Sequence, residues 1–421
     1  MDESPIVIVG AGLAGLCCAQ QLQQAKIPFL ILESTDRVGG RVRTEEVSGF
    51  RLDVGFQVLL TSYPEVVKSL DLPRLKLGQF RSGALIRYNG KFSRLADPWR
   101  EPRHLLATAV SSVGSIADKF RIFSLRRNVA RGDLDALLER PETTTRERLV
   151  VQGFSPRIID GFFGPFFGGV FLEDELHTSS RKFDYLFRLF STGVAALPEG
   201  GMSQIPQQLA AGLPNQSVRL SAAVKRVAAA SVELDSGETI AASQVVLACD
   251  PWNAARLLGS NKSLRAHGSQ TLYFAAPQPP LDEPILVLNG DGMGIVRSLC
   301  VPSQVSQGYA PAGQALISVT LHADARRNDE VDLPRQVLTE LGPWFGAPVQ
   351  QWQHLRTFEI SHALPPQDTI DPPSARPRFT IDPSGVIVCG DSHDIASIQG
   401  AMRSGREAAE HVLKEHARSS A

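Results

Sequence analysis

The sequence predicts an α/β fold, and its first 33 residues carry the main evidence. Residues 5–10 (PIVIVG) are a short apolar run typical of a buried strand, and residues 13–26 continue with the spacing of an amphipathic helix. A second apolar run, residues 28–33, ends in Glu33. Strand, helix and strand within about thirty residues indicate a βαβ unit, which places its two strands in a parallel sheet.

Further elements follow from turn signals and periodicity. Asn89-Gly90 lies between two apolar segments and predicts a hairpin over residues 83–95. Residues 100–190 have a mostly helical pattern, and residues 266–323 contain three runs that predict a meander of strands. The last of these runs, residues 314–323, alternates in a way that predicts one solvated face. Residues 385–391 read as the final strand, before a helix that begins near Ile398.

Composition excludes several classes of protein. The 43 basic and 44 acidic residues give a formal net charge of −1, so there is no electrostatic reason to expect nucleic acid. Five cysteines form no CxxC pair and no metal-ligand spacing, so we expect no metal site. No apolar run is long enough to span a membrane, and acidic residues precede the first one. We expect a cytoplasmic protein, with contact at a membrane surface left open.

The turn after the first strand, GAGLAG, matches the dinucleotide-binding pattern GxGxxG. Its first glycine makes the tight turn, the second lets the backbone approach a pyrophosphate, and the third lets helix and strand pack closely. Glu33, at the end of the second strand, can accept both ribose hydroxyls and would repel a 2′-phosphate. The pattern therefore predicts a Rossmann-like site for FAD or NAD rather than NADP. The residues of the turn are Gly10, Gly12, Leu13, Ala14 and Gly15.

A second glycine motif follows the second strand. Residues 36–44 (DRVGGRVRT) closely resemble the second glycine motif of the flavin amine oxidase superfamily, which includes phytoene desaturases and protoporphyrinogen oxidases. Residues 197–210, the strand over residues 222–227, and VIVCGD with the helix after it resemble further segments of that family. The resemblance covers the whole chain and implies FAD as cofactor. It implies contacts to FAD from Glu33, Ser34, Gly39, Gly40, Arg41, Gly55, Phe56, Gln57, Val224, Gly390, Asp391, Gln399, Gly400 and Ala401.

The domains are expected to be interleaved, because no linker or repeat separates the motifs. We predict an α/β architecture with a discontinuous, Rossmann-like FAD-binding domain, a helical insertion and a substrate domain that contains a mixed sheet. The FAD-binding domain takes residues 1–75, 190–265 and 380–421. The helical insertion takes residues 76–189, and the substrate domain takes residues 266–379.

Absent motifs narrow the chemistry further. The sequence has no second GxGxxG for a separate NAD(P)H domain and no CxxC for a disulfide reductase. No cysteine lies in residues 301–388, where some relatives attach the flavin covalently, so we expect non-covalent FAD. Oxygen or a quinone is then the expected electron acceptor.

Two departures from the family pattern bear on the substrate. Amine oxidases of this family usually place an aromatic residue just before the glycine-alanine of the closing helix, where this chain has Ile398 and Gln399. They also usually carry a lysine on a strand that matches residues 267–276, which contain none. Residues 53–72, with their tyrosine-proline pair, instead resemble the flavin-proximal segment of phytoene desaturases and hydroxysqualene-processing enzymes.

A phenylalanine-rich stretch, residues 161–172, is similar to the apolar stretches that line the substrate cavity in the desaturase branch, although plain core packing explains it equally well. The sequence thus predicts dehydrogenation of a hydrophobic substrate, isoprenoid-, carotenoid- or tetrapyrrole-like, by hydride transfer to flavin N5. Two alternatives stay open: an FAD-dependent amine oxidase acting on a carbon–nitrogen bond, and an FAD-binding protein without turnover. His362 and His393 are the candidate catalytic bases.

Overall fold

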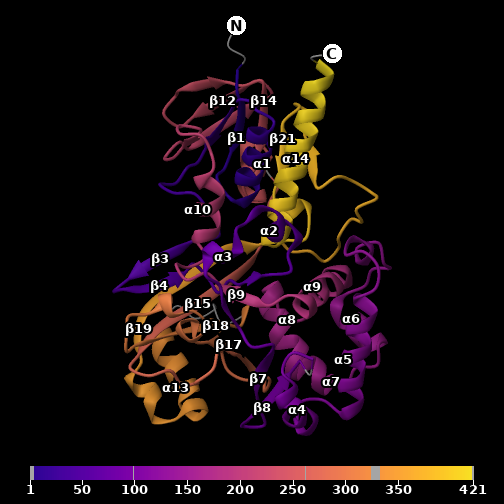
Figure 1. Cartoon of the computed structure of the whole chain (residues 1–421), viewed down its shortest axis with the longest axis vertical. Helices are drawn as coiled ribbons and strands as arrows, with labels where there is room; N and C mark the ends of the chain where they lie inside the picture. Colours follow the sequence, from indigo (N-terminus) through magenta and orange to yellow (C-terminus); the bar gives the residue numbers. More distant parts are fainter. Residues whose placement is uncertain (1–3, 98, 261, 324–331, 420–421) are drawn as a thin grey trace.

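The computed structural model describes residues 4–97, 99–260, 262–323 and 332–419. Figure 1 shows a parallel sheet with α1 and α14 at the end of the molecule that carries both termini. The opposite end holds a second sheet with α13 on one side and the helices α4 to α9 on the other. No helix among the described residues combines the length and apolarity needed to cross a bilayer.

The first sheet confirms the α/β prediction. Five of its strands run parallel in the order β10, β2, β1, β14 and β21, and the antiparallel β20 lies at the edge beside β21. Its carboxyl edge therefore collects loops from the beginning, middle and end of the chain. The strands are β1 (Ile6–Val9), β2 (Phe29–Leu32), β10 (Val218–Arg219), β14 (Gln244–Leu247), β20 (Phe379–Ile381) and β21 (Ile387–Cys389).

Two helices, α1 (Leu13–Gln24) and α14 (Ile398–Ser419), pack together on this sheet (Figure 1). They approach so closely that a Cβ atom added at Gly405 of α14 would lie 2.0 Å from the carbonyl oxygen of Ala14 in α1. Only glycine permits this crossing. It holds the first glycine turn and the last helix of the chain against each other.

The second sheet has seven strands in the order β19-β15-β18-β17-β16-β7-β8. It is mixed, because β7 runs parallel to β16 while the other pairs are antiparallel. The predicted hairpin is confirmed as β7 (Gly83–Tyr88) and β8 (Lys91–Ala96), but it joins this sheet rather than the helices that follow it. The other strands are β15 (His267–Ala276), β16 (Leu286–Asn289), β17 (Val296–Cys300), β18 (Ala315–Leu321) and β19 (Gln353–Leu364).

The predicted solvated face of residues 314–323 is wrong. All seven residues of β18 are buried, because this strand lies in the middle of the sheet. Ile317 and Val319 share a hydrophobic core with Val337 and Leu341 of α13 (Leu333–Phe345), which covers that face. The alternation instead separates this core from the more polar opposite face, which carries Ser318 and Thr320.

Helices dominate residues 100–190, as predicted. They are α4 (Leu105–Val110), α5 (Ile116–Val129), α6 (Thr145–Val151), α7 (Pro156–Ile158), α8 (Gly164–Phe171) and α9 (Ser180–Thr192), with a π-helical turn over Ile159–Phe163. The remaining smaller elements are β3 (Thr44–Val47), β4 (Phe50–Asp53), β5 (Leu59–Leu60), α2 (Pro64–Ser69), α3 (Leu72–Leu75), β6 (Gly78–Gln79), β9 (Ala195–Leu197), α10 (Gln204–Ala211), β11 (Val224–Ala228), β12 (Ser231–Leu234), β13 (Thr239–Ala241), α11 (Pro251–Leu257) and α12 (Pro302–Val305). The limits of the three domains stay a prediction.

Candidate active site

One cavity of about 1550 Å³ runs from the carboxyl edge of the first sheet to the space between the second sheet and the helices α5, α8 and α9. Binding sites for single small molecules usually measure about 300–1000 Å³, so this cavity has room for a cofactor and a substrate together. Its two parts have different linings. Glycine loops line the part beside the first sheet, together with Glu33, Arg41 and Asp391. Phenylalanines and hydroxyl groups line the rest, which also carries the charged residues Asp97, Arg100, Lys119 and Arg126.

The first glycine turn opens onto the cavity. Gly10 has φ +106°, and a Cβ atom there would lie 2.9 Å from the Ala248 carbonyl oxygen, so only glycine fits this crossing of β1 and β14. At Gly12 an added Cβ atom would meet nothing within 4 Å, because the backbone there faces open space. Gly15 does not line the cavity: its added Cβ atom would lie 2.0 Å from the Gly10 carbonyl oxygen. These are the three steric roles that the motif predicts.

The second glycine motif lies directly against the first. The Gly39 amide donates to the Ala11 carbonyl oxygen over 2.9 Å, and Gly39 and Gly12 form a parallel β-bridge. An added Cβ atom at Gly40 would lie 3.4 Å from the Gly12 Cα atom. The two loops therefore form one wall of the cavity, and α1 begins at this wall with the free N–H groups of its first turn.

Glu33 lines this part of the cavity and is otherwise buried. Its Oε2 accepts a hydrogen bond of 2.8 Å from the Ala11 amide, and its Oε1 accepts from the amide and the hydroxyl of Thr35 at 2.9 and 2.8 Å. The carboxylate thus fixes the glycine turn. Each carboxylate oxygen can accept more than one bond, so Glu33 keeps capacity for ligand hydroxyls.

Arg41 and Asp391 meet across 350 residues of sequence. The Arg41 Nη2 atom lies 2.6 Å from Asp391 Oδ1, and its Nη1 donates to the Ala363 carbonyl oxygen over 3.0 Å. Burial opposes the charge of Arg41, but attraction to Asp391 prevails and raises the pKa of the guanidinium. Both side chains line the cavity. An oriented guanidinium that faces the cavity near a helix N-terminus suits a ligand phosphate.

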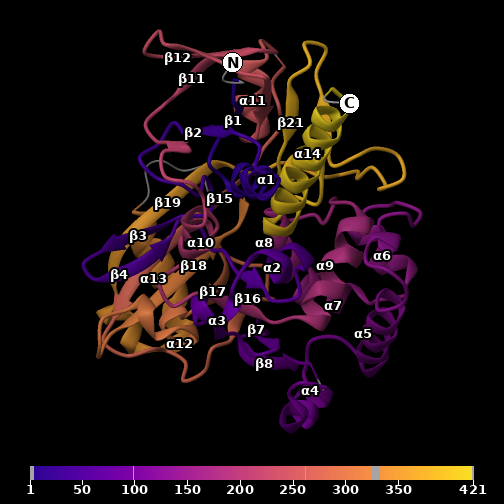
Figure 2. The same cartoon turned by 45° about the horizontal axis from the view of Figure 1, so that its top comes forward.

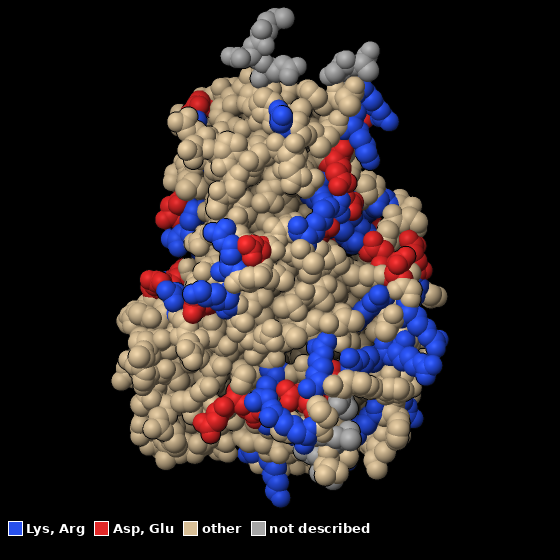
Figure 3. All heavy atoms as spheres, in the orientation of Figure 1, with Lys and Arg blue, Asp and Glu red and all other residues tan. Residues whose placement is uncertain are grey.

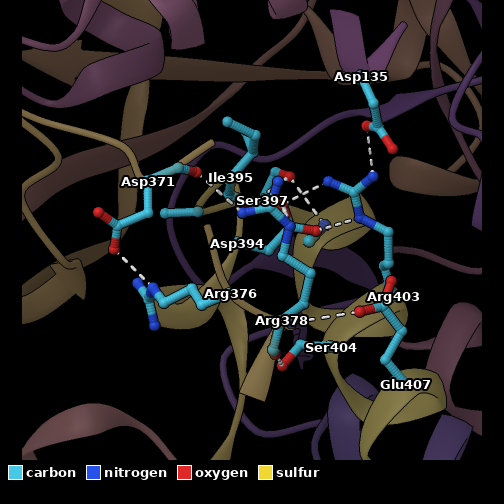
Figure 4. Close-up of polar contacts among 12 residues, drawn as sticks. Asp135, Asp371, Arg376, Arg378, Asp394, Ile395, Ser397, Arg403, Ser404 and Glu407 are labelled. Atoms are coloured by element: carbon cyan, nitrogen blue, oxygen red, sulfur yellow. Dashed lines mark hydrogen bonds and ion pairs between the residues drawn. The ribbon is translucent and has the colours of Figure 1, made fainter. Parts of the chain in front are cut away.

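The start of α14 is held by a dense set of polar contacts (Figure 4). Asp394, which is fully buried, forms an ion pair with Arg403 and lies 3.6 Å from the Nε atom of Arg378. The Ser397 hydroxyl accepts a hydrogen bond of 3.1 Å from the Gly400 amide. These contacts fix the turn that leads from β21 into α14, next to the cavity-lining residues Ala396 and Ala401.

Most of the predicted contact residues are brought together. Those that line the cavity are Gly10, Gly12, Leu13, Ala14, Glu33, Ser34, Gly39, Gly40, Arg41, Gly55, Phe56, Gln57, Val224, Gly390, Asp391 and Ala401. Gln399 and Gly400 lie behind this surface, as does Gly15. The Gln399 side chain instead accepts a hydrogen bond of 2.8 Å from the Glu65 amide in the first turn of α2. An added Cβ atom at Gly400 would lie 1.9 Å from the Ile395 carbonyl oxygen.

The two candidate bases differ in position. His362 lines the cavity beside the Trp252 ring, with 4.7 Å between ring centroids, close to Ala363 and Arg41 rather than to the phenylalanines. His393 does not line the cavity. Its Nε2 lies 3.1 Å from the Thr380 hydroxyl, and burial lowers its pKa to about 4. His393 is therefore neutral near neutral pH and is tied to β20.

The second part of the cavity has an apolar wall and a polar floor. Phe162 and Phe166 line it from the π-helical turn and α8, and Phe187 and Phe190 line it from α9. Their neighbours Phe163 and Phe171 are fully buried core residues. The phenylalanine-rich stretch therefore contributes some side chains to the cavity lining and others to the core. The polar floor comes from one residue on each of three strands of the second sheet, Ser269, Ser298 and Thr320, and Leu286 and Leu288 of β16 lie in the same lining.

The hydroxyl groups of this floor were missed by sequence analysis. Ser298 pairs with Thr320 across β17 and β18, and Thr320 pairs with Thr271 across β18 and β15. The three side chains thus form a row across three strands, in which Ser298 and Thr320 line the cavity and Thr271 lies behind them. The Thr271 hydroxyl is buried and has no hydrogen-bond partner within the described parts of the chain. Alternation within β18 was visible in the sequence, but the alignment of three strands was not.

Tyr63 was also missed as a lining residue. It precedes Pro64 of α2 in the tyrosine-proline pair, is buried, and contacts the cavity next to Ser397 and Ile398. Burial raises the pKa of its hydroxyl, which shares a hydrogen bond with Ser397. An aromatic ring therefore does lie at the start of α14, although it comes from a different part of the sequence.

These features fit FAD. The wall of two glycine loops offers backbone N–H groups at a position that a side chain at Gly12 would fill. Glu33 offers a hydrogen-bond acceptor for ribose hydroxyls, and Arg41 offers a hydrogen-bond donor for a phosphate. Cys249 is the one cysteine among the described lining residues, and it lies beside Gly10 rather than in the phenylalanine-lined part.

Comparison with known proteins gives the same assignment. The sequence profile of the family described as "Flavin containing amine oxidoreductase" matches residues 13–413. The L-amino-acid oxidase of Crotalus adamanteus is 25% identical over 299 residues, which cover 64% of this chain and 55% of that protein. The chain thus spans about half the length of this curated relative.

Solved structures agree on the fold. A putrescine oxidase variant superposes with a TM-score of 0.73 at 18% identity, over 98% of this chain and 99% of that one. The cyclohexylamine oxidase of Brevibacterium oxydans gives a TM-score of 0.71 at 16% identity, over 98% and 99%. A UDP-galactopyranose mutase gives 0.67 at 16% identity, over 98% and 96%. FAD is the cofactor for which the two glycine loops are built, and the chain belongs to the flavin-containing amine oxidoreductase family.

Proposed function

We propose that this chain is an FAD-dependent oxidase that acts on the carbon–nitrogen bond of an amine with a bulky apolar body. The observation that carries the proposal is the continuous cavity, in which the cofactor site opens into a chamber with a phenylalanine wall and a hydroxyl floor. Oxygen is the proposed electron acceptor.

The chamber supports a substrate with two different ends. The rings of Phe162, Phe166 and Phe190 supply an apolar surface, which gains free energy by covering a hydrocarbon body. The lining residues Ser269, Ser298 and Thr320 supply hydroxyl groups that can accept from or donate to a small polar group. A substrate that matches both surfaces carries one polar group on a large apolar body.

The choice of an amine rests on the relatives. The named relatives include oxidases of amines and amino acids, and this favours the carbon–nitrogen alternative over dehydrogenation of a hydrocarbon. Tyr63 adds support, because it provides an aromatic ring at the start of α14 where the sequence shows Ile398 and Gln399. The second candidate is the desaturase-type reaction on an isoprenoid- or tetrapyrrole-like substrate, because the phenylalanine wall also suits a wholly apolar molecule.

The residues of the chain position the reactants and exclude water. Bound FAD would supply the hydride acceptor for the oxidation. The glycine loops, Glu33 and Arg41 would hold the cofactor, and the phenylalanine-lined chamber would orient the substrate and exclude water from it. A neutral amine needs no strong base for this step, which is consistent with the position of His362 beside Arg41 and away from the chamber.

The test compares two substrate panels on the FAD-loaded protein. Primary amines and L-amino acids of increasing apolar size should release ammonia and hydrogen peroxide, with the highest kcat/KM for the bulky members. Polyene hydrocarbons and porphyrinogens should not consume oxygen. Turnover of the hydrocarbon panel with no ammonia from any amine would instead establish the second candidate, and no turnover with either panel would support a protein that binds FAD without catalysis.

A further inference from the structure

Helix α5 carries apolar side chains on the face that points to solvent. Ile116, Phe120 and Phe123 are spaced four and three residues apart, which places them on one stripe of the helix. Ile116 and Phe120 are 68% and 69% exposed. The opposite face buries Leu125 and Val129 in the core, so the outer stripe is not needed to attach the helix.

More exposed apolar residues join this stripe. Trp99 is 52% exposed and stacks on Phe123 with 5.2 Å between ring centroids and 11° between ring planes. Leu106 on α4 is 79% exposed. We call the five residues Trp99, Leu106, Ile116, Phe120 and Phe123 the apolar rim. Exposed apolar side chains that cluster in this way mark interaction surfaces, whereas single ones need no explanation.

The rim surrounds the entrance to the substrate part of the cavity. Trp99, Ile116, Phe120 and Phe123 line the cavity and are exposed at the same time. Lys119 links α5 to the end of α4, since its Nζ donates to the carbonyl oxygens of Ala109 at 2.8 Å and Ser111 at 3.0 Å. Figure 1 and Figure 2 place α4 at the end of the molecule away from both termini.

Charge around the rim is positive. Residues 97–131 contain seven Lys or Arg and three Asp or Glu. The three acids are engaged within the protein: Asp97 pairs with Arg126 at 2.6 Å, Glu101 pairs with Arg103 at 3.2 Å, and Asp118 is buried under Ser115 and Ser155.

Two of the cations are free to act outward. Arg127 and Arg131 are exposed and have no carboxylate partner in the part of the chain that the structure describes. In the lower part of the face in Figure 3, where α4 and α5 lie, blue side chains are more frequent than red ones.

We propose that the apolar rim docks on the surface of an anionic lipid bilayer and opens the substrate cavity toward the lipid. Trp and Phe side chains at a protein surface insert at the boundary between headgroups and acyl chains, and Arg side chains are attracted to anionic headgroups. A second copy of the chain fits less well, because the positive charges around the two rims would face each other across a symmetric contact. A protein partner bound here would cover the cavity entrance.

The test is binding of the full, FAD-loaded chain to vesicles, which needs no turnover and so fails or succeeds independently of the proposed function. One set of vesicles contains phosphatidylcholine alone, and the other contains phosphatidylcholine with phosphatidylglycerol. We expect binding to the anionic vesicles, roughly tenfold or more weaker binding to the neutral ones, and a blue shift of tryptophan fluorescence that Trp99→Phe abolishes. Phe120→Ser should weaken binding by roughly tenfold or more, because burial of this ring is lost.

The matched control is Val151→Ser on α6, which removes an apolar side chain that is 82% exposed but lies outside the rim. It should bind like the unchanged chain. Unchanged FAD content and thermal midpoint of the Phe120→Ser protein would exclude misfolding. The proposal is overturned by absence of binding to anionic vesicles, by equal losses in both variants, by binding that Phe120→Ser leaves unchanged, or by self-association through the rim in place of vesicle binding.

Discussion

The crossing of α1 and α14 gives the sharpest stability prediction. In Gly405→Ala the new Cβ atom would lie 2.0 Å from the Ala14 carbonyl oxygen and 2.6 Å from its carbonyl carbon. Ordinary van der Waals contact begins near 3.4 Å, so the helices must separate by about 1.4 Å at this point. The obstacle is backbone, so no side-chain rotation relieves it.

The size of the effect follows from two opposing contributions. Overpacking of this kind costs about 1–3 kcal/mol and occasionally more, and the clash here is at the severe end. Replacing glycine by alanine inside a helix returns about 1 kcal/mol. We expect a net loss of about 2 kcal/mol. An unfolding entropy of roughly 2.1 cal/mol/K per residue converts this loss to a decrease of about 2 °C in Tm for a chain of this length.

The assay is thermal unfolding with and without added FAD, together with the FAD content of the purified protein. Because α14 begins at the cofactor site, Gly405→Ala should also retain less FAD than the unchanged chain. Gly212→Ala is the matched control: Gly212 has φ −88°, and an added Cβ atom there meets nothing within 4 Å. The control should be neutral or more stable by about 0.4–1 kcal/mol. If Gly405→Ala behaved like Gly212→Ala, the close crossing of the two helices would be refuted.

Three further predictions concern the cofactor site, a buried acid and the chamber. Glu33→Gln should retain FAD roughly ten times less tightly, since it loses charge-assisted bonds to the glycine turn and the ribose; equal retention in equilibrium dialysis would count against this role. Burial raises the pKa of Asp53 to about 6 from its ordinary 3.8, so the unchanged protein loses stability as pH rises from about 4 to 6. The free energy of unfolding of Asp53→Asn should therefore rise by about 3 kcal/mol relative to that of the unchanged chain across this pH window, measured by urea unfolding. A difference in unfolding free energy that stays constant with pH would contradict this prediction. Phe166→Ala should lower kcat/KM for bulky amines about tenfold and leave small amines within about twofold; a uniform loss would place the substrate elsewhere.

Local signals in the sequence were sufficient for the nucleotide site. The steric requirements at Gly10, Gly12 and Gly15 act between neighbouring segments, so a short motif contains them. The contact of Arg41 with Asp391 spans the chain and was not predicted, since the family resemblance implied only that each residue touches FAD. Gln399 was expected to face the flavin, but a buried amide needs hydrogen-bond partners, and its side-chain oxygen binds the start of α2 instead.

The substrate side was harder to predict because strand pairing decides it. The hairpin of β7 and β8 was evident from Asn89-Gly90, yet its place in the sheet depends on parallel pairing with β16, about 200 residues later. The hydroxyl row depends on the alignment of three strands, which periodicity within one strand does not define. The apolar rim is visible only once the inner face of α5 is known to be filled by other residues.

The most direct measurement of the central claim is an anaerobic titration of the FAD-loaded protein with a bulky primary amine. The account predicts that the absorption band of oxidised flavin disappears within one turnover, and that one ammonia and one carbonyl product form for each flavin reduced. An absorption band that every amine and amino acid leaves unchanged, while dithionite removes it and a hydrocarbon substrate bleaches it, would contradict the claim.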